Sequence, residues 1–496
     1  MYDILIIGGG INGAGIARDA AGRGLKVLLC EKDDLAAHTS SASTKLIHGG
    51  LRYLEHYDFA LVRKALLERE VLLKAAPHII WPLRFVLPHH KDLRPSWLIR
   101  LGLFLYDHLG GRKLLPPTKT RTRSDDAVFD PLKSKFSKGF EYSDCWVDDA
   151  RLVALNASDA AARGAEIMTR TECVSLDTQT THWNATLRID GQAEKQISAK
   201  SVINAAGPWV DHVAGFTGLN ANSPSVRLVK GSHIIVPSLF TDERCFIFQA
   251  GDGRIVFAIP YENGRFTLIG TTDLPFDGDL NSVTASDEEI DYLCSLSNEY
   301  FEQQITPDDV VSTYSGVRPL FEDHAANASS VTRDYVLKLE QRDGAKLLSV
   351  IGGKITTYRK LAEDALDVLK PALPAHSGAW TATAALPGGD IESADFEAFE
   401  HACDAQYDWL DVSVRHRLAR TYGTKTHDIL RDASNETDLG HHYGAGLYQK
   451  EVDYLVEHEF ARTEEDILMR RTKLGLHMSP EQIIALRHHL DPRLVA

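Results

Sequence analysis

The chain opens with two short apolar runs separated by a cluster of glycines, a pattern that predicts a β-α-β unit. The run from Ile4 to Ile7 is typical of a buried strand, and the segment from Ala14 to Gly22 is typical of a short helix. The second apolar run is followed by an acidic residue, Glu31. Glycines at positions 8, 10 and 13 lie between the first strand and the helix, where a dinucleotide-binding turn carries them.

These glycines and Glu31 have distinct tasks in such a turn. Gly8 permits the tight turn, Gly10 lets the backbone approach a pyrophosphate, and Gly13 lets the helix pack closely on the strand. Unpaired amides at the helix N-terminus favour the phosphate charge. Glu31 follows Gly13 by eighteen residues and can accept hydrogen bonds from ribose hydroxyls. The unit therefore predicts an ADP-containing cofactor without a 2′-phosphate; an ordinary β-α-β turn is the alternative.

Later patterns predict that the first unit belongs to a discontinuous domain. Strand patterns return between residues 169 and 206, and a strand, a glycine turn and a helix recur between 347 and 369. Residues 226–273 alternate short strands with turns, which is typical of an antiparallel sheet. Residues 385–496 lack strand patterns and are expected to form helices after a linker at 385–389.

The chain is therefore predicted to have an α/β fold with three parts. These are a discontinuous Rossmann-like domain at about 1–76, 145–215 and 330–384, an inserted β-rich domain at about 77–144 and 216–329, and a C-terminal helical domain at 385–496.

The net charge, the cysteine spacing and the lengths of the apolar runs exclude several classes of protein. The net charge is −15, from 69 acidic and 54 basic residues, and it repels nucleic acid, so no nucleic-acid partner is expected. Six cysteines are scattered without a C-x-x-C spacing, and the first strand begins almost at Met1, which leaves no room for a signal peptide. No run of eighteen uncharged apolar residues occurs. A cytoplasmic protein that does not span a membrane is expected.

Residues 77–115 reverse the sign of the charge. Their six basic residues, Arg84, Lys91, Arg94, Arg100, Arg112 and Lys113, stand against Asp92 and Asp107. Apolar residues recur there at helical spacing: Trp97, Leu98, Leu101, Phe104 and Leu105. Such a helix suits docking on an anionic membrane surface. A buried core helix with snorkelling arginines has the same spacing, and the pattern does not distinguish the two.

Three further segments carry candidate chemistry. Residues 40–55 combine hydroxyls, glycines and titratable groups with buried-type leucines, which favours a packed site over a solvated loop. Residues 204–210 place small residues at a strand end, where a flat ligand can approach. Residues 352–360 repeat the glycine-turn pattern before a helix, with Thr356 or Thr357 as candidate N-cap and Lys354 as a fixed cation.

Several motifs in one order resemble the aerobic, FAD-dependent glycerol-3-phosphate dehydrogenases. They are SSASTKLIHGGLRYLE, KGFEYSDCWVDDARL, KGSHIIVP, IGTTD, YSGVRPL, TRDY and GGKITTYRKLAE, and the likeness runs from Tyr2 to the C-terminus. The resemblance implies a fold like that of D-amino acid oxidase, with an FAD domain, a β-rich cap and a helical C-terminal domain. It implies oxidation of sn-glycerol 3-phosphate to dihydroxyacetone phosphate through FAD, with electrons passed to a quinone.

The same resemblance assigns residues to the substrate. Arg52, Arg318 and Lys354 are expected to contact the phosphate and the product oxyanion, with Tyr53 beside them. His233 is the first choice for the base, because an ordinary histidine pKa near 6.5 suits that role. His48 competes with it, although its place before Gly49 suits flavin packing. Arg333 is a second-tier candidate for the substrate or for an ion pair with Asp334. The expected catalytic residues are His233, Arg318 and Lys354.

The expected partners follow from the family likeness as well. They are glycerol 3-phosphate, a quinone, an anionic membrane surface on the inner face of the cytoplasmic membrane, and a second copy of the chain in a homodimer. FAD is the expected cofactor. The residues expected to bind it are Gly8, Gly10, Asn12, Gly13, Glu31, Lys32, Ser40, Ser41, Lys45, His48, Gly49, Gly207, Gly353, Lys354 and Thr356.

Other readings stay open at this point. A glycerol-3-phosphate oxidase that uses oxygen is the nearest, although such oxidases usually carry a cap insertion that this chain lacks. An amine or amino-acid oxidase and a non-catalytic flavin-binding regulator are more distant. Adjacent histidines, as in His89 and His90, diverge rather than converge on one ion, so no metal is expected. The task of the C-terminal domain is open, and its basic stretch at 462–473 is typical of a solvated helix face.

Overall fold

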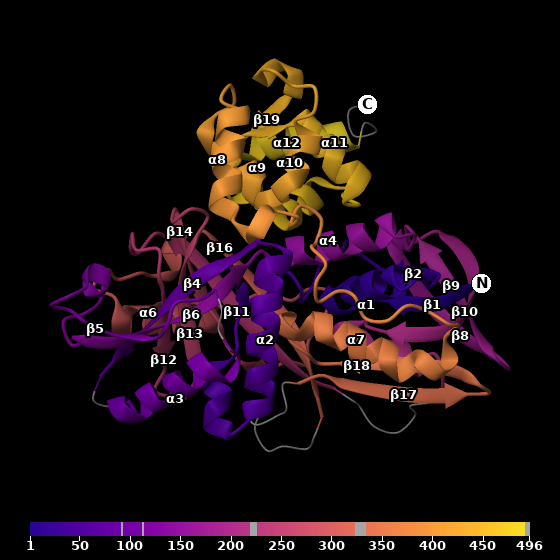
Figure 1. The fold of residues 1–496 in the computed structure, drawn as a ribbon, viewed down its shortest axis with the longest axis horizontal. Coiled ribbons are helices and arrows are strands. Elements are labelled where there is room, and N and C mark those ends of the chain that lie inside the picture. Colours follow the sequence, from indigo (N-terminus) through magenta and orange to yellow (C-terminus); the bar gives the residue numbers. More distant parts are fainter. Residues whose placement is uncertain (91–92, 112–113, 219–225, 323–333, 492–496) are drawn as a thin grey trace.

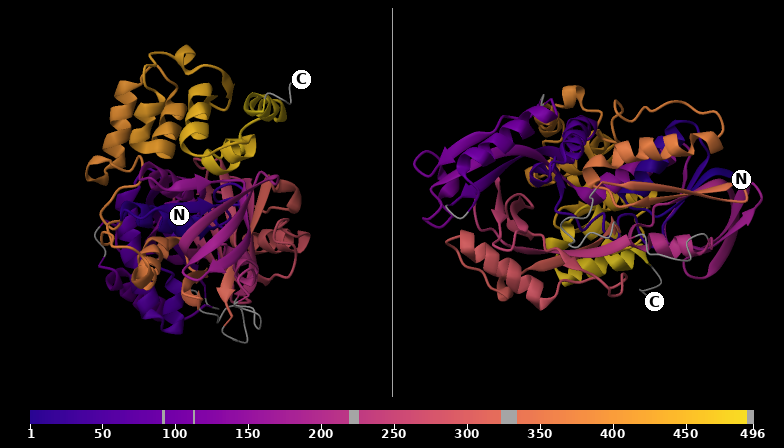
Figure 2. Two further views of the ribbon diagram at one scale, coloured as in Figure 1. Left: turned by 90° about the vertical axis from the view of Figure 1, so that its right-hand side faces the viewer. Right: turned by 90° about the horizontal axis from the view of Figure 1, so that it is seen from below.

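The computed structural model describes residues 1–90, 93–111, 114–218, 226–322 and 334–491. They form two large β-sheets that stand beside each other and a helical domain that lies over the boundary between them (Figure 1). A view from the side shows the same helical domain, orange to yellow, seated on both sheets (Figure 2). Helices flank both sheets, so the predicted α/β class is confirmed.

The first sheet has eight strands and a parallel centre. Its order is β17-β18-β10-β1-β2-β7, with β9 antiparallel to β10 and β8 antiparallel to β9. The strands span Tyr2–Ile7 (β1), Val27–Cys30 (β2), Glu166–Met168 (β7), Thr171–Gln179 (β8), His182–Ile189 (β9), Ala193–Asn204 (β10), Val336–Arg342 (β17) and Ala345–Ile351 (β18).

Strand β1 is apolar from Ile4 to Ile7 because both faces of this stretch are covered. Ile4 and Ile6 join the core beneath helices α1 (Ile11–Gly22), α4 (Asp149–Ala162) and α7 (Tyr358–Leu369). Leu5 and Ile7 point the other way, into a core that includes residues of β8, β9 and α5 (Val210–Gly215). The period of two along a strand therefore produces a three-layer α/β arrangement.

The second sheet has ten strands and is mostly antiparallel. Its order is β15-β11-β14-β13-β12-β4-β6-β3, with β16 on β11 and β5 on β6. The strands span Leu46–Ile47 (β3), Ile80–His89 (β4), Lys119–Thr122 (β5), Lys138–Val147 (β6), Val226–Pro237 (β11), Cys245–Gln249 (β12), Ile255–Tyr261 (β13), Phe266–Gly270 (β14), Leu274–Pro275 (β15) and Ser312–Phe321 (β16).

Aromatic side chains fill the cores on both faces of this sheet. On one face, helix α6 (Asp287–Tyr300) contributes Tyr300, whose ring stacks on Phe136 with 4.7 Å between centroids. On the other face, helices α2 (Phe59–Ala75) and α3 (Ser96–Leu109) pack Leu66 and Tyr106 against strands β4 and β6. Because apolar side chains of the sheet point to both sides, it is an internal layer rather than an open surface.

The C-terminal domain has its own core. Its helices span Phe396–Gln406 (α8), Val412–Tyr422 (α9), Thr426–Ile429 (α10), Gln449–His458 (α11) and Pro480–Leu490 (α12). The expectation that this part lacks strands was wrong, since β19 (His442–Gly444) and β20 (Leu447–Tyr448) form a small hairpin. The two strands are only three and two residues long, too short for an alternating pattern to emerge. Across the described residues, we find no helix whose length and apolarity would let it traverse a membrane.

Candidate active site

A cavity of about 750 Å³ lies between the two sheets. One wall is built from the carboxyl ends of β1, β2 and β18 and the turns that follow them, and the other from β11, β13 and β16. Parallel strands of α/β folds place their ligands at this end. The cavity therefore has one wall of the dinucleotide-binding type and a second wall formed by the antiparallel sheet.

Close backbone packing at one end of the cavity requires glycine. Gly8 has a φ of +113°, and a Cβ on it would lie 2.4 Å from the Ala205 carbonyl oxygen. A Cβ on Gly13 would lie 1.9 Å from the Gly8 carbonyl oxygen. Gly10 is the N-cap of α1, and the next amide, of Ile11, donates to Ser40 Oγ at 3.0 Å. Only residues without a side chain allow the strand, turn and helix to meet this closely.

The carboxylate of Glu31 is held by the backbone at this same end. Its Oε2 accepts from the Gly9 amide at 2.6 Å, and its Oε1 accepts from the Asp33 amide at 2.8 Å. Burial raises the pKa of Glu31. Lys32 lies at the rim, where its Nζ is 4.0 Å from the Trp209 ring centroid and donates to Asn281 Oδ1 at 2.6 Å. The carboxylate is thus fixed where the turn of an ADP-binding unit places it.

The two glycine turns of the sequence meet in space. Asn12, at the start of α1, donates from Nδ2 to the Gly352 carbonyl oxygen at 3.2 Å. Gly352 and Gly353 have φ values of +72° and +96°, and Lys354 follows them into the cavity wall. Helix α7 then begins at Tyr358 with Thr357 at the N-cap position, although no side chain caps it. Thr356 instead bridges to the His48 backbone.

The far end of the cavity gathers cations from distant parts of the chain. Arg52 and Tyr53 come from the 3₁₀ turn Leu51–His56, and Lys354 Nζ lies 3.6 Å from the centroid of the Tyr53 ring. Arg318, on β16, donates from Nη2 to Asp273 Oδ1 at 2.9 Å. The cavity is therefore lined by Glu31 in the dinucleotide-type turn and by Arg52, Arg318 and Lys354 from other segments.

His233, on β11, lies in the cavity wall and is 2% exposed. Its Nε2 is 2.9 Å from Thr44 Oγ1, and its ring stacks on Tyr314 with 4.7 Å between centroids. Burial, with Lys45 and Arg318 nearby, lowers the pKa of His233 to about 3. The expectation of an ordinary histidine pKa was therefore wrong. A buried imidazole among cations resists protonation and stays neutral at physiological pH.

The structure brings most of the expected site residues to this cavity. Lining residues from the expected set are Gly8, Gly10, Asn12, Glu31, Lys32, Ser40, His48, Arg52, Tyr53, Gly207, His233, Arg318, Gly353 and Lys354. Five others do not line it: Gly13, Ser41, Lys45, Gly49 and Thr356. Of these, Lys45 is buried and its Nζ lies 2.8 Å from Asp149 Oδ1. Arg333 lies outside the described residues.

Some lining residues were not anticipated from the sequence. Thr44 sits in the hydroxyl-rich segment but carries no signal that separates it from its neighbours. Asp273, in the IGTTD motif, pairs with Arg318, and that pairing requires the tertiary fold, which brings β16 and β14 to the two edges of β11. Arg254 lines the wall, and its guanidinium carbon lies 3.8 Å from the Tyr292 ring centroid. Each depends on a long-range contact that local patterns do not contain.

One group of possible metal ligands gathers at the Glu31 end. Glu31, Asp33 and His38 each offer an atom within 4.8 Å of the others. His38 Nε2 lies 2.7 Å from Asp33 Oδ2, and both Glu31 oxygens accept backbone hydrogen bonds. These mutual bonds account for the group without an ion.

Comparisons with known proteins agree with this architecture. Residues 3–359 match the model of FAD dependent oxidoreductases, and residues 379–488 match the C-terminal domain of alpha-glycerophosphate oxidase. A glycerol-3-phosphate dehydrogenase from Pseudomonas aeruginosa is 53% identical over 99% of this chain and 95% of its own. A D-erythritol 1-phosphate dehydrogenase from Brucella abortus is 52% identical, over 99% and 97%.

A solved structure extends the comparison to the whole fold. The glycerol-3-phosphate dehydrogenase from Bacillus halodurans complexed with FAD superposes with a TM-score of 0.76 at 28% identity, covering all of this chain and 94% of that one. The residues of the cavity fit FAD. Gly8 and Gly13 leave no room for a side chain, Glu31 is held in place for a ribose, and the buried Oδ1 of Asn12 has no hydrogen-bond partner among the described residues. The chain therefore belongs to the FAD-dependent oxidoreductases, in the family that includes the aerobic glycerol-3-phosphate dehydrogenases.

Proposed function

We propose that the protein oxidises sn-glycerol 3-phosphate to dihydroxyacetone phosphate and passes the electrons to a membrane quinone. The observation that carries this proposal is that Arg52, Arg318 and Lys354 line the same cavity as a neutral, buried His233. FAD supplies the two-electron acceptor, at flavin N5, for the hydride that leaves carbon 2. The hydroxyl proton leaves in the same oxidation, so the site must bind a dianion and take up one proton.

Arg52, Arg318 and Lys354 are suited to bind the phosphate dianion. A phosphate dianion is bound most strongly by guanidinium and ammonium groups held in a partly desolvated site. Asp273 and the Thr272 carbonyl oxygen hold one edge of the Arg318 guanidinium, at 2.9 Å and 3.4 Å from Nη2. Tyr53 supports Lys354 through its ring face. These contacts orient the cations before the phosphate arrives, which lowers the entropic cost of binding.

His233 is suited to take up the hydroxyl proton of the substrate. Because its imidazole is neutral, it can accept the carbinol proton, and the negative charge of a bound phosphate would favour the imidazolium that results. Thr44 holds Nε2, and the Tyr314 ring fixes the plane of the imidazole. Close packing also restricts movement of the imidazole ring, since a Cβ on Gly270 would lie 2.0 Å from His233 Cδ2. We assign the general base to His233 on this geometry.

Replacement of Arg318 tests the phosphate assignment. We expect Arg318→Lys to lower kcat/KM about tenfold to hundredfold, or roughly 1.4–2.8 kcal/mol, because a point charge replaces a planar fork. FAD content should be unchanged. Steady-state kinetics of the flavin-loaded variant measure the effect. Arg227→Lys is the control, because Arg227 pairs with Glu322 and does not line the cavity. Wild-type kinetics in Arg318→Lys would remove Arg318 from the substrate site.

A second polyol phosphate is favoured by the comparisons. The relatives include the D-erythritol 1-phosphate dehydrogenase at nearly the same identity as the glycerol-3-phosphate dehydrogenase. Both names describe a phosphorylated polyol, and the cations of the cavity would bind the phosphate of either compound equally well. Anaerobic flavin reduction by each compound separates them, since the physiological substrate should have the higher kcat/KM.

We propose a quinone as the electron acceptor. Reduction of a soluble quinone analogue in step with substrate oxidation would support the quinone. Stoichiometric hydrogen peroxide from oxygen, with no quinone reduction, would instead support the oxidase reading.

We propose that helix α3 docks the protein on the cytoplasmic face of the membrane. Trp97 and Phe104 are 68% and 57% exposed, whereas Leu103 and Tyr106 on the opposite side of the helix are buried. The alternative of a helix buried all round does not fit that exposure. Arg94 and Arg100 are exposed beside the apolar residues. Lys91, Asp92, Arg112 and Lys113, which contributed to the expected patch, lie outside the described residues.

Liposome flotation tests the docking helix. We expect wild-type protein to float with vesicles that contain anionic lipid, and Trp97→Asp with Phe104→Asp to abolish flotation, because two carboxylates would enter the apolar boundary. Val412→Asp is the control, since Val412 is 61% exposed but lies on α9 of the C-terminal domain. Equal flotation of the double variant and the wild type would refute docking through α3. The homodimer stays a prediction from the family likeness.

A further inference from the structure

The segment between β2 and β3, residues 31–45, contributes both to the nucleotide end of the cavity and to the contacts of His233. Glu31 lies at the nucleotide end, Ser40 Oγ accepts from the first amide of α1, and Thr44 holds His233. Apart from short turns, no regular secondary structure supports this segment, which we call the cofactor loop. Something outside the loop must therefore keep it in place.

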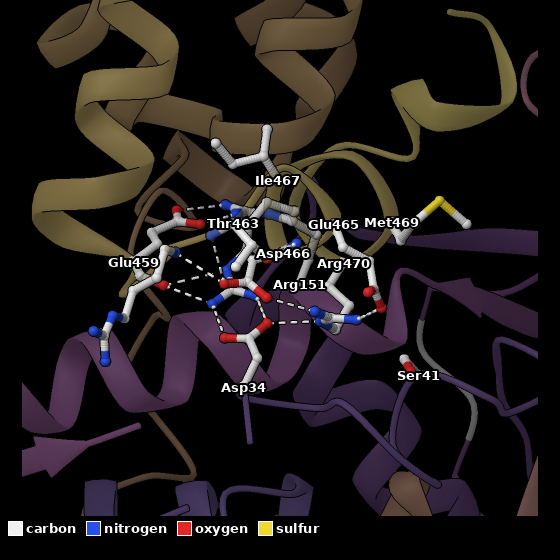
Figure 3. A network of polar contacts seen from close by, with 12 residues as sticks. Asp34, Ser41, Arg151, Glu459, Thr463, Glu465, Asp466, Ile467, Met469 and Arg470 are labelled. Carbon is white, nitrogen blue, oxygen red and sulfur yellow. Dashed lines mark hydrogen bonds and ion pairs between the residues drawn. The ribbon is translucent and has the colours of Figure 1, made fainter. Parts of the chain in front are cut away.

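A buried carboxylate in the cofactor loop is held by the C-terminal domain. Asp34 is 1% exposed, and both of its oxygens accept from guanidinium groups (Figure 3). Arg470 Nε donates to Oδ2 at 2.6 Å, while Arg471 donates from Nη1 to Oδ2 at 2.7 Å and from Nη2 to Oδ1 at 2.8 Å. Two consecutive arginines thus converge on one carboxylate from a domain more than 400 residues away in the chain.

The two arginines are themselves fixed. They end a turn of π-helix, Asp466–Arg471, whose first residue accepts from Arg470 Nη2 at 2.5 Å. Arg471 Nη2 also donates to the Glu459 carbonyl oxygen at 2.8 Å, and the Glu459 carboxylate pairs with Arg151 of α4. The expectation of a solvated basic face was wrong here, because Arg470 and Arg471 are 7% and 1% exposed. Their charges are buried and paired, which the sequence alone does not reveal.

A second buried cluster holds the other end of the loop. Asp149 pairs with Lys45 and accepts from Ser43 Oγ at 2.7 Å. Lys473 of the C-terminal domain lies 3.5 Å from Asp148 and is 8% exposed. The C-terminal domain therefore reaches the loop directly at Asp34 and, through α4, near Lys45.

We propose that the C-terminal domain acts as a clamp on the cofactor loop, in which Arg470 and Arg471 are positioning residues for FAD retention and for the Thr44–His233 contact. Asp34→Asn would leave the buried guanidinium charges without their carboxylate, and Arg471→Lys would lose the two-point contact with Asp34, so in either case the loop would open to hydrate the buried charge. The proposal rests on FAD binding and not on the identity of the substrate.

The release of FAD from the holoprotein tests the clamp. We expect Arg471→Lys and Asp34→Asn each to release FAD at least tenfold faster on dilution, as measured by the rise of free-flavin fluorescence. Trypsin should then cut after Lys45 in both variants, because that buried residue becomes accessible. Arg462→Ala is the matched control: Arg462 joins the C-terminal domain to Asp190 through an exposed pair and does not contact the cofactor loop.

The outcomes separate the clamp from a general loss of stability. Faster release and loop cleavage in the two clamp variants, with wild-type behaviour in Arg462→Ala, would establish the clamp. A variant that folds but purifies without FAD also supports it. Wild-type release rates in a folded Asp34→Asn or Arg471→Lys would overturn it, and so would equal acceleration in Arg462→Ala. If Arg471→Lys does not fold, Asp34→Asn alone decides, because asparagine keeps the size of the side chain.

Discussion

The Gly13→Ala protein is expected to fold but to purify without FAD. The new Cβ would lie 1.9 Å from the Gly8 carbonyl oxygen, and that oxygen belongs to a backbone turn that cannot rotate away. Helix α1 must therefore move from β1, and its N-terminal amides with it. We expect an FAD affinity at least about a hundredfold weaker, equivalent to roughly 2.7 kcal/mol of lost binding.

Titration of the apoprotein with FAD measures this loss, and thermal unfolding shows whether the variant is folded. Gly215→Ala is the matched control, because a Cβ on this glycine of α5 has no heavy atom within 4 Å. If Gly13→Ala retained FAD as tightly as the wild type, the turn could not be the nucleotide cradle that we describe.

The His233→Asn protein should keep FAD and lose most of its rate of flavin reduction. A positioned base contributes about 10²- to 10⁴-fold, so a fall of at least about a hundredfold is expected in stopped-flow measurements at saturating substrate. His212→Asn is the control, since His212 lines the cavity but its side chain is exposed. A rate within a few-fold of the wild type would remove His233 as the base.

The pH dependence adds a second criterion for His233. With a pKa lowered to about 3, the imidazole is already neutral at pH 5.5 and gains no further basic form as pH rises to 8. The ratio of wild-type to His233→Asn rates should therefore stay constant over that range. The rates are compared at saturating substrate, so the effect of phosphate ionisation on substrate binding does not enter this ratio. A ratio that collapses as pH falls through 6.5 would show that His233 titrates like an ordinary histidine.

Local patterns predicted the parts of the site that depend on backbone shape. The strand, glycine turn and helix at residues 3–31 follow a local pattern, because Gly13 is required by its contact with Gly8 inside that unit, although Gly8 itself packs on Ala205, which follows the neighbouring strand β10. The same holds for the turn at Gly352, whose positive φ a glycine accepts readily. The family likeness supplied the roles of Arg52, His233 and Arg318, which local patterns alone would not have distinguished, whereas the glycine turn before it had already marked Lys354 as a candidate cation.

Ion pairs between residues far apart in the sequence could not be predicted. Lys45 reads as a candidate ligand in its segment, yet it is committed to Asp149 of α4. Arg470 and Arg471 read as a solvated face, yet they converge on Asp34 in the buried network of Figure 3. A charged side chain can be buried when the tertiary fold brings an oppositely charged partner near it. The spacing of the two residues in the sequence does not reveal that they will pair.

Anaerobic addition of sn-glycerol 3-phosphate to the FAD-loaded protein tests the central claim most directly. We expect the visible absorbance band of oxidised flavin to bleach, with dihydroxyacetone phosphate formed in equal amount and no change on addition of unphosphorylated glycerol. Bleaching by D-erythritol 1-phosphate alone would move the assignment to that polyol phosphate. An oxidised flavin spectrum after saturating additions of both phosphates would contradict the proposed function.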